Sequence, residues 1–185
     1  MLFSKIFTAG AIMATTAMAA LTPAQIADSL KTITTQSQNL QGPAQSITIV
    51  NAPLIVIGQG PFPPIISGFT QIVTTATAAI SQFDGTPKIT NQADADLVFG
   101  AFRTFVRVHQ ELLNILIGKA GILTQLPFVG PPVAAVLRSV EGVVDSVAIF
   151  LIDTVEARAK DIESDANSLG GTLDLTIEKY QGLSV

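Results

Sequence analysis

Apolar residues recur at alternating intervals of four and three positions between Val133 and Leu151. The series consists of Val133, Leu137, Val140, Val144, Val147 and Leu151. Residues at these intervals share one face of an α-helix, whereas a β-strand requires an interval of two. Val136, Val143 and Phe150 widen the same face beyond what one partner helix would cover. The segment therefore predicts a helix, opened by Pro131-Pro132, that packs against more than one neighbour.

Four other segments carry the same spacing. The first begins at Thr22, a cap followed by Pro23 and Gln25, and its stripe is Ile26, Leu30, Ile33, Ser37 and Leu40. Gly42-Pro43 interrupts it. Residues 44–51 then fit either a continued helix or, through alternation in residues 46–50, a strand; we favour the helix because the neighbouring segments are helical.

The other three helices are bounded by turn and cap residues. One runs from Ile65 to Phe83, after a connector rich in Pro and Gly at residues 53–64, and ends in a turn at residues 84–87. Asn91 can cap the next helix, which Gly118 and Gly121 close before a second apolar loop at residues 119–130. The last follows a capping-box pattern at residues 153–156 and extends to Tyr180.

These segments predict an all-α fold, an up-and-down bundle of about five helices with no sheet. Residues 1–20 read as a secretory signal peptide, with Lys5 before an apolar stretch and a small-x-small cleavage pattern at Ala17-Met18-Ala19. A short N-terminal membrane anchor or a buried first helix is the alternative. Residues 21–185 are then one helical domain, without a further segment long and apolar enough to span a membrane.

No charged residue occurs among the 52 positions between Lys31 and Asp84. The whole chain is 48% hydrophobic and 13% charged, and acidic residues outnumber Lys plus Arg by 14 to 10. This balance argues against disorder and against nucleic-acid binding. A neutral face of hydroxyl and amide side chains indicates contact with something less polar than water, or a secreted and O-glycosylated protein that tolerates low charge.

The leader, the absence of cysteine and the closing helix with Ile162, Leu169, Leu173, Ile177 and Tyr180 on one side together resemble the fungal hydrophobic surface binding protein A family. That family includes the antigenic cell-wall mannoproteins or galactomannoproteins. The resemblance covers residues 22–180. It implies a secreted, non-enzymatic protein that adsorbs to hydrophobic surfaces and helps to recruit hydrolases, or one that encloses a fatty acid between helices. The Pro- and Gly-rich connectors depart from the usual pattern.

The sequence lacks the residue patterns that common catalytic and metal sites require. There is no Gly-x-Ser-x-Gly motif, and His109, the only histidine, has no evident nucleophile as partner. A di-metal bundle needs Glu-x-x-His pairs, and the residue three before His109 is Val106. Asp161 and Asp165 are the best-placed pair of carboxylates for acid–base chemistry, but they fit a solvated helix face. We therefore expect no enzymatic activity, no cofactor and no metal.

The candidate lipid-binding residues lie on the apolar stripes: Phe69, Ile72, Phe83, Phe102, Phe105, His109, Leu112, Leu137, Val140 and Val144. His109 stands in register with its apolar neighbours and could anchor a lipid carboxylate, or be a partly buried histidine satisfied by a carbonyl or a water. The stripes also fit an ordinary core. The candidates for surface adsorption are the connector residues Ile55, Val56, Phe62 and Phe128.

The sequence thus favours a secreted protein, extracellular or in the cell wall, that binds apolar matter. Its expected partners are a hydrophobic surface or a fatty acid, and a secreted hydrolase. The alternative is a structural, antigenic wall mannoprotein with no small ligand.

Overall fold

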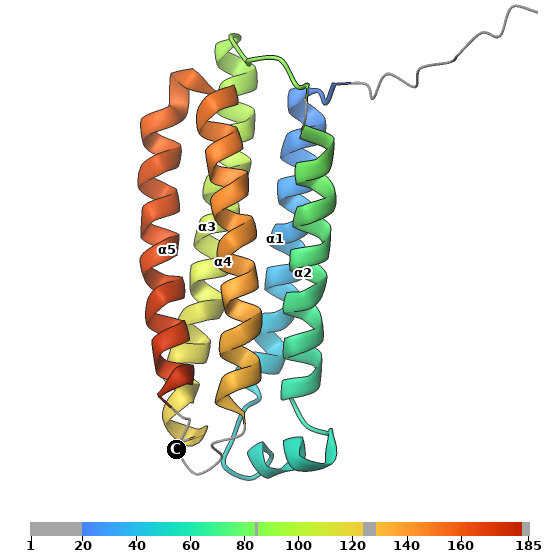
Figure 1. Ribbon diagram of the computed structural model, residues 1–185, viewed down its shortest axis with the longest axis vertical. Coiled ribbons are helices and arrows are strands. Elements are labelled where there is room, and N and C mark those ends of the chain that lie inside the picture. Colours follow the sequence, from blue (N-terminus) through green and yellow to red (C-terminus); the bar gives the residue numbers. More distant parts are fainter. Residues whose placement is uncertain (1–19, 84, 124–128, 183–185) are drawn as a thin grey trace, which may run out of the picture.

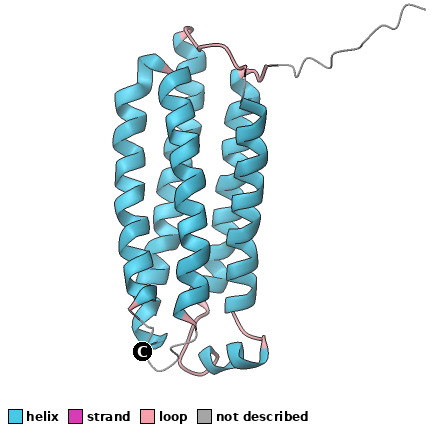
Figure 2. Cartoon of the chain, in the orientation of Figure 1, coloured by secondary structure: helices cyan, strands magenta, loops and turns pink. Residues whose placement is uncertain are grey.

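The part of the chain that the structure describes forms five α-helices, each antiparallel to the next along the chain (Figure 1). The computed structural model describes residues 20–83, 85–123 and 129–182, so the signal peptide predicted at residues 1–20 lies almost entirely outside the described residues. The helices are α1 (Pro23–Gln45), α2 (Phe62–Phe83), α3 (Gln92–Ala120), α4 (Gly130–Thr154) and α5 (Ala159–Gln181). The described residues contain no strand, as Figure 2 shows. The predicted all-α up-and-down bundle is confirmed.

The helices pack as a closed ring rather than as a sequential row. α1 packs against α2 and α3, α5 against α3 and α4, and α2 against α4, so the order around the ring is α1, α2, α4, α5, α3. Each helix presents its apolar stripe to the centre and to two neighbours, which accounts for the wide apolar face expected for α4. No described helix is long and apolar enough to cross a bilayer.

Two predicted helix starts are confirmed by their caps. The Thr22 hydroxyl accepts a hydrogen bond from the Gln25 backbone N–H, and the Gln25 side chain accepts one from the Thr22 N–H at 2.8 Å. Asn91 Oδ1 accepts from the N–H groups of Ala93 and Asp94. These caps satisfy backbone donors that the first turn of a helix leaves unpaired.

Three predicted boundaries are wrong. α1 runs through Gly42 and Pro43 without the predicted interruption and ends at Gln45. Of residues 44–51, therefore, only the first two are helical, and residues 46–51 form neither the favoured helix nor a strand. A 3₁₀ helix, η1 (Ala52–Ile57), follows, and α2 begins at Phe62, inside the predicted connector. The capping pattern at residues 153–156 starts no helix: α4 continues to Thr154, and a short 3₁₀ turn, η3 (Glu156–Arg158), precedes α5.

Candidate functional site

A small void lies inside the helix ring. Four helices line it, through Leu30 and Ile33 of α1, Ile72 and Ala76 of α2, Phe105 of α3 and Val143, Val144 and Val147 of α4. Every lining side chain is apolar, and the free space is about 10 Å³. Such a space holds about one water molecule, and an apolar void of this kind remains dry. The helix ring is therefore almost filled by side chains here, and little free space is left between α1, α2, α3 and α4.

One polar pair is buried beside this void. Ser37 and His109 are both fully inaccessible to solvent, and Ser37 Oγ lies 2.9 Å from His109 Nδ1. Ser37 follows the void-lining Ile33 by four residues, and His109 follows Phe105 by four. Four residues are one turn, or about 6 Å along the axis. Since α1 and α3 run in the same direction (Figure 1), the pair lies on the η1 side of the void.

Aromatic rings surround the imidazole. The Phe105 ring lies 5.3 Å from it between centroids, and the Phe69 ring lies 6.0 Å away in an edge-to-face arrangement at 74°. Burial lowers the pKa of His109 to about 4 because desolvation disfavours the charged form. His109 is therefore neutral at physiological pH. Its Nε2 atom is buried and has no hydrogen-bond partner among the described residues.

The predicted lipid-binding residues divide into three groups. Ile72, Phe105 and Val144 line the void. Phe69 and His109 lie one turn away, as described above. The others are buried in the surrounding core, where Phe102 lies 6.3 Å from Phe105 between ring centroids and Phe83 stacks on Phe150 at 4.1 Å; Leu112, Leu137 and Val140 are fully buried.

Sequence reasoning missed the partner of His109 and five of the residues that line the void, namely Leu30, Ile33, Ala76, Val143 and Val147. Leu30, Ile33 and Ser37 all belong to the apolar stripe of α1, where Ser37 is the single hydroxyl residue. A serine at an otherwise apolar position of a buried stripe is the signal that could have identified it, because a buried hydroxyl needs a partner.

Of the four predicted surface-adsorption residues, the structure describes the side chain of Phe62 alone, and it contradicts that prediction. Phe62 is fully buried, because it is the first inward-facing residue of the α2 stripe that continues through Ile65 and Phe69. Ile55 and Val56 belong to η1, with side chains outside the described set, and Phe128 lies outside the described residues. Among the side chains that the structure describes at this end, the exposed large apolar ones are Ile49, Val50, Leu54 and Ile57, with 77%, 88%, 39% and 66% of their surface accessible. We call these four residues the apolar tip.

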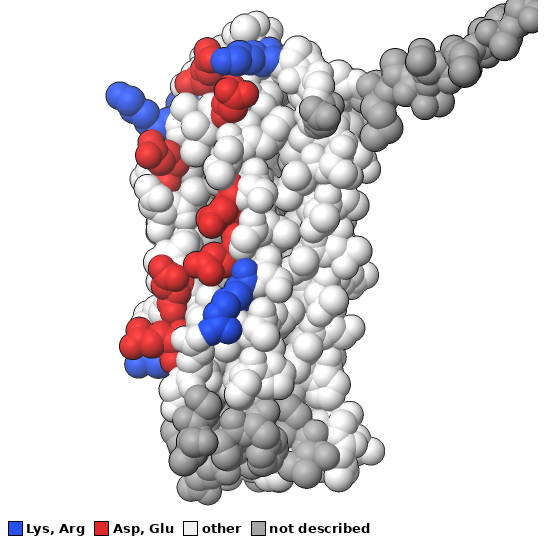
Figure 3. Space-filling model, in the orientation of Figure 1, with Lys and Arg blue, Asp and Glu red and all other residues white. Residues whose placement is uncertain are grey.

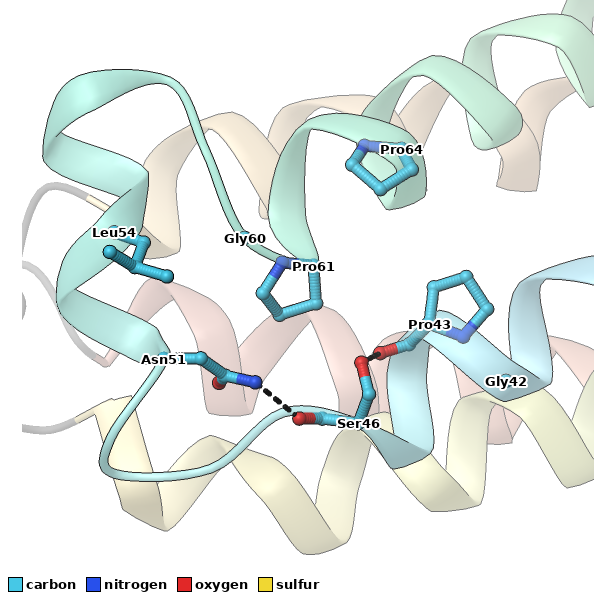
Figure 4. Close-up of a pocket in the computed structure, with 8 residues that line it drawn as sticks. All are labelled: Gly42, Pro43, Ser46, Asn51, Leu54, Gly60, Pro61 and Pro64. Atoms are coloured by element: carbon cyan, nitrogen blue, oxygen red, sulfur yellow. Dashed lines mark hydrogen bonds between the residues drawn. The ribbon is translucent and has the colours of Figure 1, made fainter.

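An open hollow of about 540 Å³ adjoins the apolar tip, between the end of α1, η1 and the start of α2 (Figure 4). Asn51 Nδ2 donates to the Ser46 carbonyl at 2.6 Å, and Ser46 Oγ donates to the Pro43 carbonyl at 2.7 Å. These bonds fix the connector where α1 ends. Leu54 and the prolines Pro43, Pro61 and Pro64 supply most of the apolar lining, and no lining residue carries a charge.

Charge is unevenly distributed over the face that Figure 3 shows. Figure 3 shows Lys, Arg, Asp and Glu gathered over α4 and α5, while the face over α2 is without charge in the same view. Ion pairs join elements on the charged side, with Arg103 2.9 Å from Asp165 and Arg158 2.6 Å from Asp96. Among the described residues no three side chains are placed to hold a metal ion.

Two solved structures share this fold. The first is ligand binding domain 1 of the Penicillium marneffei MP1 protein, complexed with arachidonic acids; it superimposes with a TM-score of 0.70 at 16% identity, over 83% of this chain and 94% of that one. The second is Afmp4p in complex with palmitic acid, with a TM-score of 0.59 at 20% identity, over 87% of this chain and 98% of that one.

Sequence comparison adds nothing to this likeness. No family model matches the chain, and no curated protein matches it. The resemblance to the antigenic mannoproteins is confirmed at the level of the fold. The chain has the five-helix fold of these ligand-binding domains.

Proposed function

We propose that this protein is a non-enzymatic lipid-binding protein that encloses a long-chain fatty acid or a related single-chain lipid between its helices. The observation that carries the proposal is the void inside the ring, whose lining side chains, from α1, α2, α3 and α4, are all apolar. Both structural neighbours were solved with a fatty acid, which supports the same class of ligand here.

Binding requires the void to widen, because about 10 Å³ cannot hold an acyl chain. In a ring of five helices, side chains that face each other across the interior can separate while each helix keeps its contacts with its two neighbours. A chain of about fifteen methylenes gains about 12 kcal/mol at ~0.8 kcal/mol each. Association, ordering and separation of the packed core reduce this gain. No charged side chain is needed to hold the chain.

A matched pair of α2 variants tests the placement. Ala76 lines the void, whereas Ala78, two residues along, is exposed. Native mass spectrometry with added palmitic acid should give one bound molecule for the wild type and for Ala78→Leu, and a large loss of bound lipid for Ala76→Leu. Circular dichroism establishes that both variants are folded. Equal uptake by the two variants would exclude the ring axis as the site.

The apolar tip supports a second proposal, adsorption to a hydrophobic surface. Ile49, Val50 and Ile57 are mostly exposed, and the chain from Thr32 to Phe83 carries no charge that would oppose contact with an apolar phase. Substituting these three residues with Ser should reduce depletion of the protein onto polystyrene beads. Ile149→Ser is the control, since Ile149 is 68% exposed but lies in α4. An equal loss of adsorption in the control would show that the apolar tip is not the site of adsorption.

Secretion through the leader, a cell-wall location and recruitment of a hydrolase complete the proposal. N-terminal sequencing of the protein from culture medium tests the leader, with cleavage near Ala19 or Ala20. Retention of a hydrolase on an apolar support only with this protein present tests recruitment. A purified protein that takes up no lipid would favour the structural mannoprotein instead.

A further inference from the structure

The Ser37–His109 pair can be assigned its protons by counting hydrogen bonds. Ser37 Oγ lies 2.9 Å from His109 Nδ1 and 3.1 Å from the Ile33 carbonyl, and the hydroxyl has one proton. If Ser37 donates to Ile33, it accepts from Nδ1–H, and both contacts are hydrogen bonds. If Ser37 donates to Nδ1, the proton moves to Nε2 and a buried N–H is left without a partner. Unpaired buried donors are costly, so the first arrangement is favoured.

In this arrangement His109 Nε2 is a free hydrogen-bond acceptor. Nε2 is at the end of the ring far from the α3 backbone, and it is buried without a partner among the described residues. The imidazole lies one turn from the void lining on α3, and Ser37 lies one turn from it on α1. An unused acceptor beside an apolar void is suited to a ligand with an apolar chain and one donor.

A charged head group is disfavoured at this position. Desolvation by burial lowers the pKa of His109, and no ion pair or hydrogen bond among the described residues brings a charged group to its ring. An ionised carboxylate would face a lone pair on Nε2 and would have no cation to offset its desolvation. An uncharged hydroxyl can instead donate to Nε2, which removes the unpaired acceptor from the core.

We propose that His109 Nε2, held as an acceptor by Ser37, selects single-chain lipids whose uncharged head group donates a hydrogen bond, namely a long-chain alcohol or an undissociated fatty acid. This inference rests on the proposed function, because it presumes that the chain occupies the ring axis. The head group then lies on the η1 side of the void and the chain extends toward the opposite end of the bundle.

The test compares four twelve-carbon ligands on the purified full-length mature protein by isothermal titration at pH 5.0. These are dodecan-1-ol, its methyl ether, dodecanoic acid and dodecanesulfonate, which stays ionised. The alcohol should bind about 5- to 10-fold more tightly than the ether, the effect of one hydrogen bond. Dodecanesulfonate should bind more weakly than the alcohol. Dodecanoic acid and the alcohol should both bind more tightly than the ether. The tighter binder of the two then shows whether the head-group hydroxyl comes from an acid or from an alcohol.

Two variants connect the preference to the pair. His109→Phe keeps an aromatic ring but removes the acceptor, and Ser37→Ala frees the imidazole to present an N–H, so each should bring alcohol and ether within about 2-fold of each other. Ser146→Ala is the control, because Ser146 makes the same bond to a carbonyl four residues back but is exposed. Equal binding of alcohol and ether by the wild type, or an unchanged preference in both variants, would overturn the inference. Absence of binding by all four ligands would instead contradict the proposed function.

Discussion

At the scale of single residues, His109 is placed at a cost to stability. Its imidazole is fully buried, one ring nitrogen has no partner among the described residues, and burial holds its pKa near 4. In the unfolded chain the same group titrates near 6.5. Between these values the unfolded state binds one more proton than the folded state, so stability rises with pH through this window.

Replacing His109 by Phe should remove that pH dependence. The linkage slope is about 1.4 kcal/mol per pH unit. Lowering the pH from 7 to 4.5 should therefore reduce the free energy of unfolding of the wild type by about 2 to 3 kcal/mol through this group. His109→Phe should therefore match or exceed the wild type at pH 7, where an unpaired acceptor is removed, and exceed it clearly at pH 4.5. Urea unfolding at both pH values measures the difference. Parallel pH profiles for the two proteins would show that His109 is not buried in the neutral form.

Glu141 provides a second residue-scale prediction, of opposite sign. Desolvation, followed by its contact with the Asp174 carboxyl, raises the pKa of Glu141. The folded state then holds the proton more tightly than the unfolded state, so stability falls as pH rises through this range. Glu141→Gln should stabilise the protein at pH 7 by up to about 0.5 kcal/mol, the scale of a partly exposed charge pair, and should have no effect below both pKa values. Glu163→Gln, on an exposed part of α5, is the charge-matched control for thermal unfolding.

At the scale of elements, α2 packs tightly against Leu40 of α1 at Gly68. A Cβ built there would lie 2.3 Å from Leu40 Cδ2 and 3.0 Å from Leu40 Cγ, and Leu40 is itself buried. Gly68→Ala should therefore destabilise the protein by about 1 to 3 kcal/mol through overpacking. In a Leu40→Ala background the same change should cost less, which a double-mutant cycle in urea measures.

Gly142→Ala is the matched control for that substitution. A Cβ at Gly142 meets nothing within 4 Å, and the residue lies inside α4. There the change should stabilise the protein by up to about 1 kcal/mol through helix propensity alone. Similar effects at both glycines would contradict the close approach of α1 and α2.

The element scale also explains how far the sequence could predict this fold. Helices with three- and four-residue apolar spacing were predictable because the pattern is local, and so were the caps at Thr22 and Asn91. The pattern at residues 153–156 misled because tertiary contacts override it: Thr154 and Val155 are buried, and the Thr154 carbonyl accepts from the Ile89 N–H at 2.8 Å. α4 is thereby extended past the predicted start of the last helix.

The site was predictable only in part, for a related reason. Periodicity identifies which residues face inward, and its candidates included Ile72, Phe105 and Val144, which line the void. Whether an inward residue faces the ring axis or a neighbouring helix depends on the order of helices around the ring, which no local pattern encodes. Leu30, Ile33 and Ser37 were missed because α1 neighbours α3, its parallel partner, as well as α2.

At the scale of the whole molecule, a ligand on the ring axis should stabilise four helices together. α1, α2, α3 and α4 line the void, whereas α5 contributes no side chain to it. Saturating palmitic acid at about 100 times its dissociation constant should raise the free energy of unfolding by about 2.7 kcal/mol. Amide hydrogen exchange should slow most around Leu30, Ala76, Phe105 and Val144, since local opening there exposes the bound chain. Amides of α5 should gain protection from exchange only because the bound lipid makes global unfolding rarer.

The same exchange experiment separates axial binding from contact at the apolar tip. A lipid held only by Ile49, Val50, Leu54 and Ile57 would protect the connector between α1 and α2 and leave the centre of the bundle unchanged. Ala76→Leu would not alter that pattern, whereas it should abolish the protection expected for an axial ligand. Protection that is confined to residues 46–61 and persists in Ala76→Leu would therefore indicate a lipid bound at the surface and not one enclosed between the helices. Protection across the four lining helices, lost in Ala76→Leu and kept in Ala78→Leu, is the outcome that the closed ring and its apolar void predict.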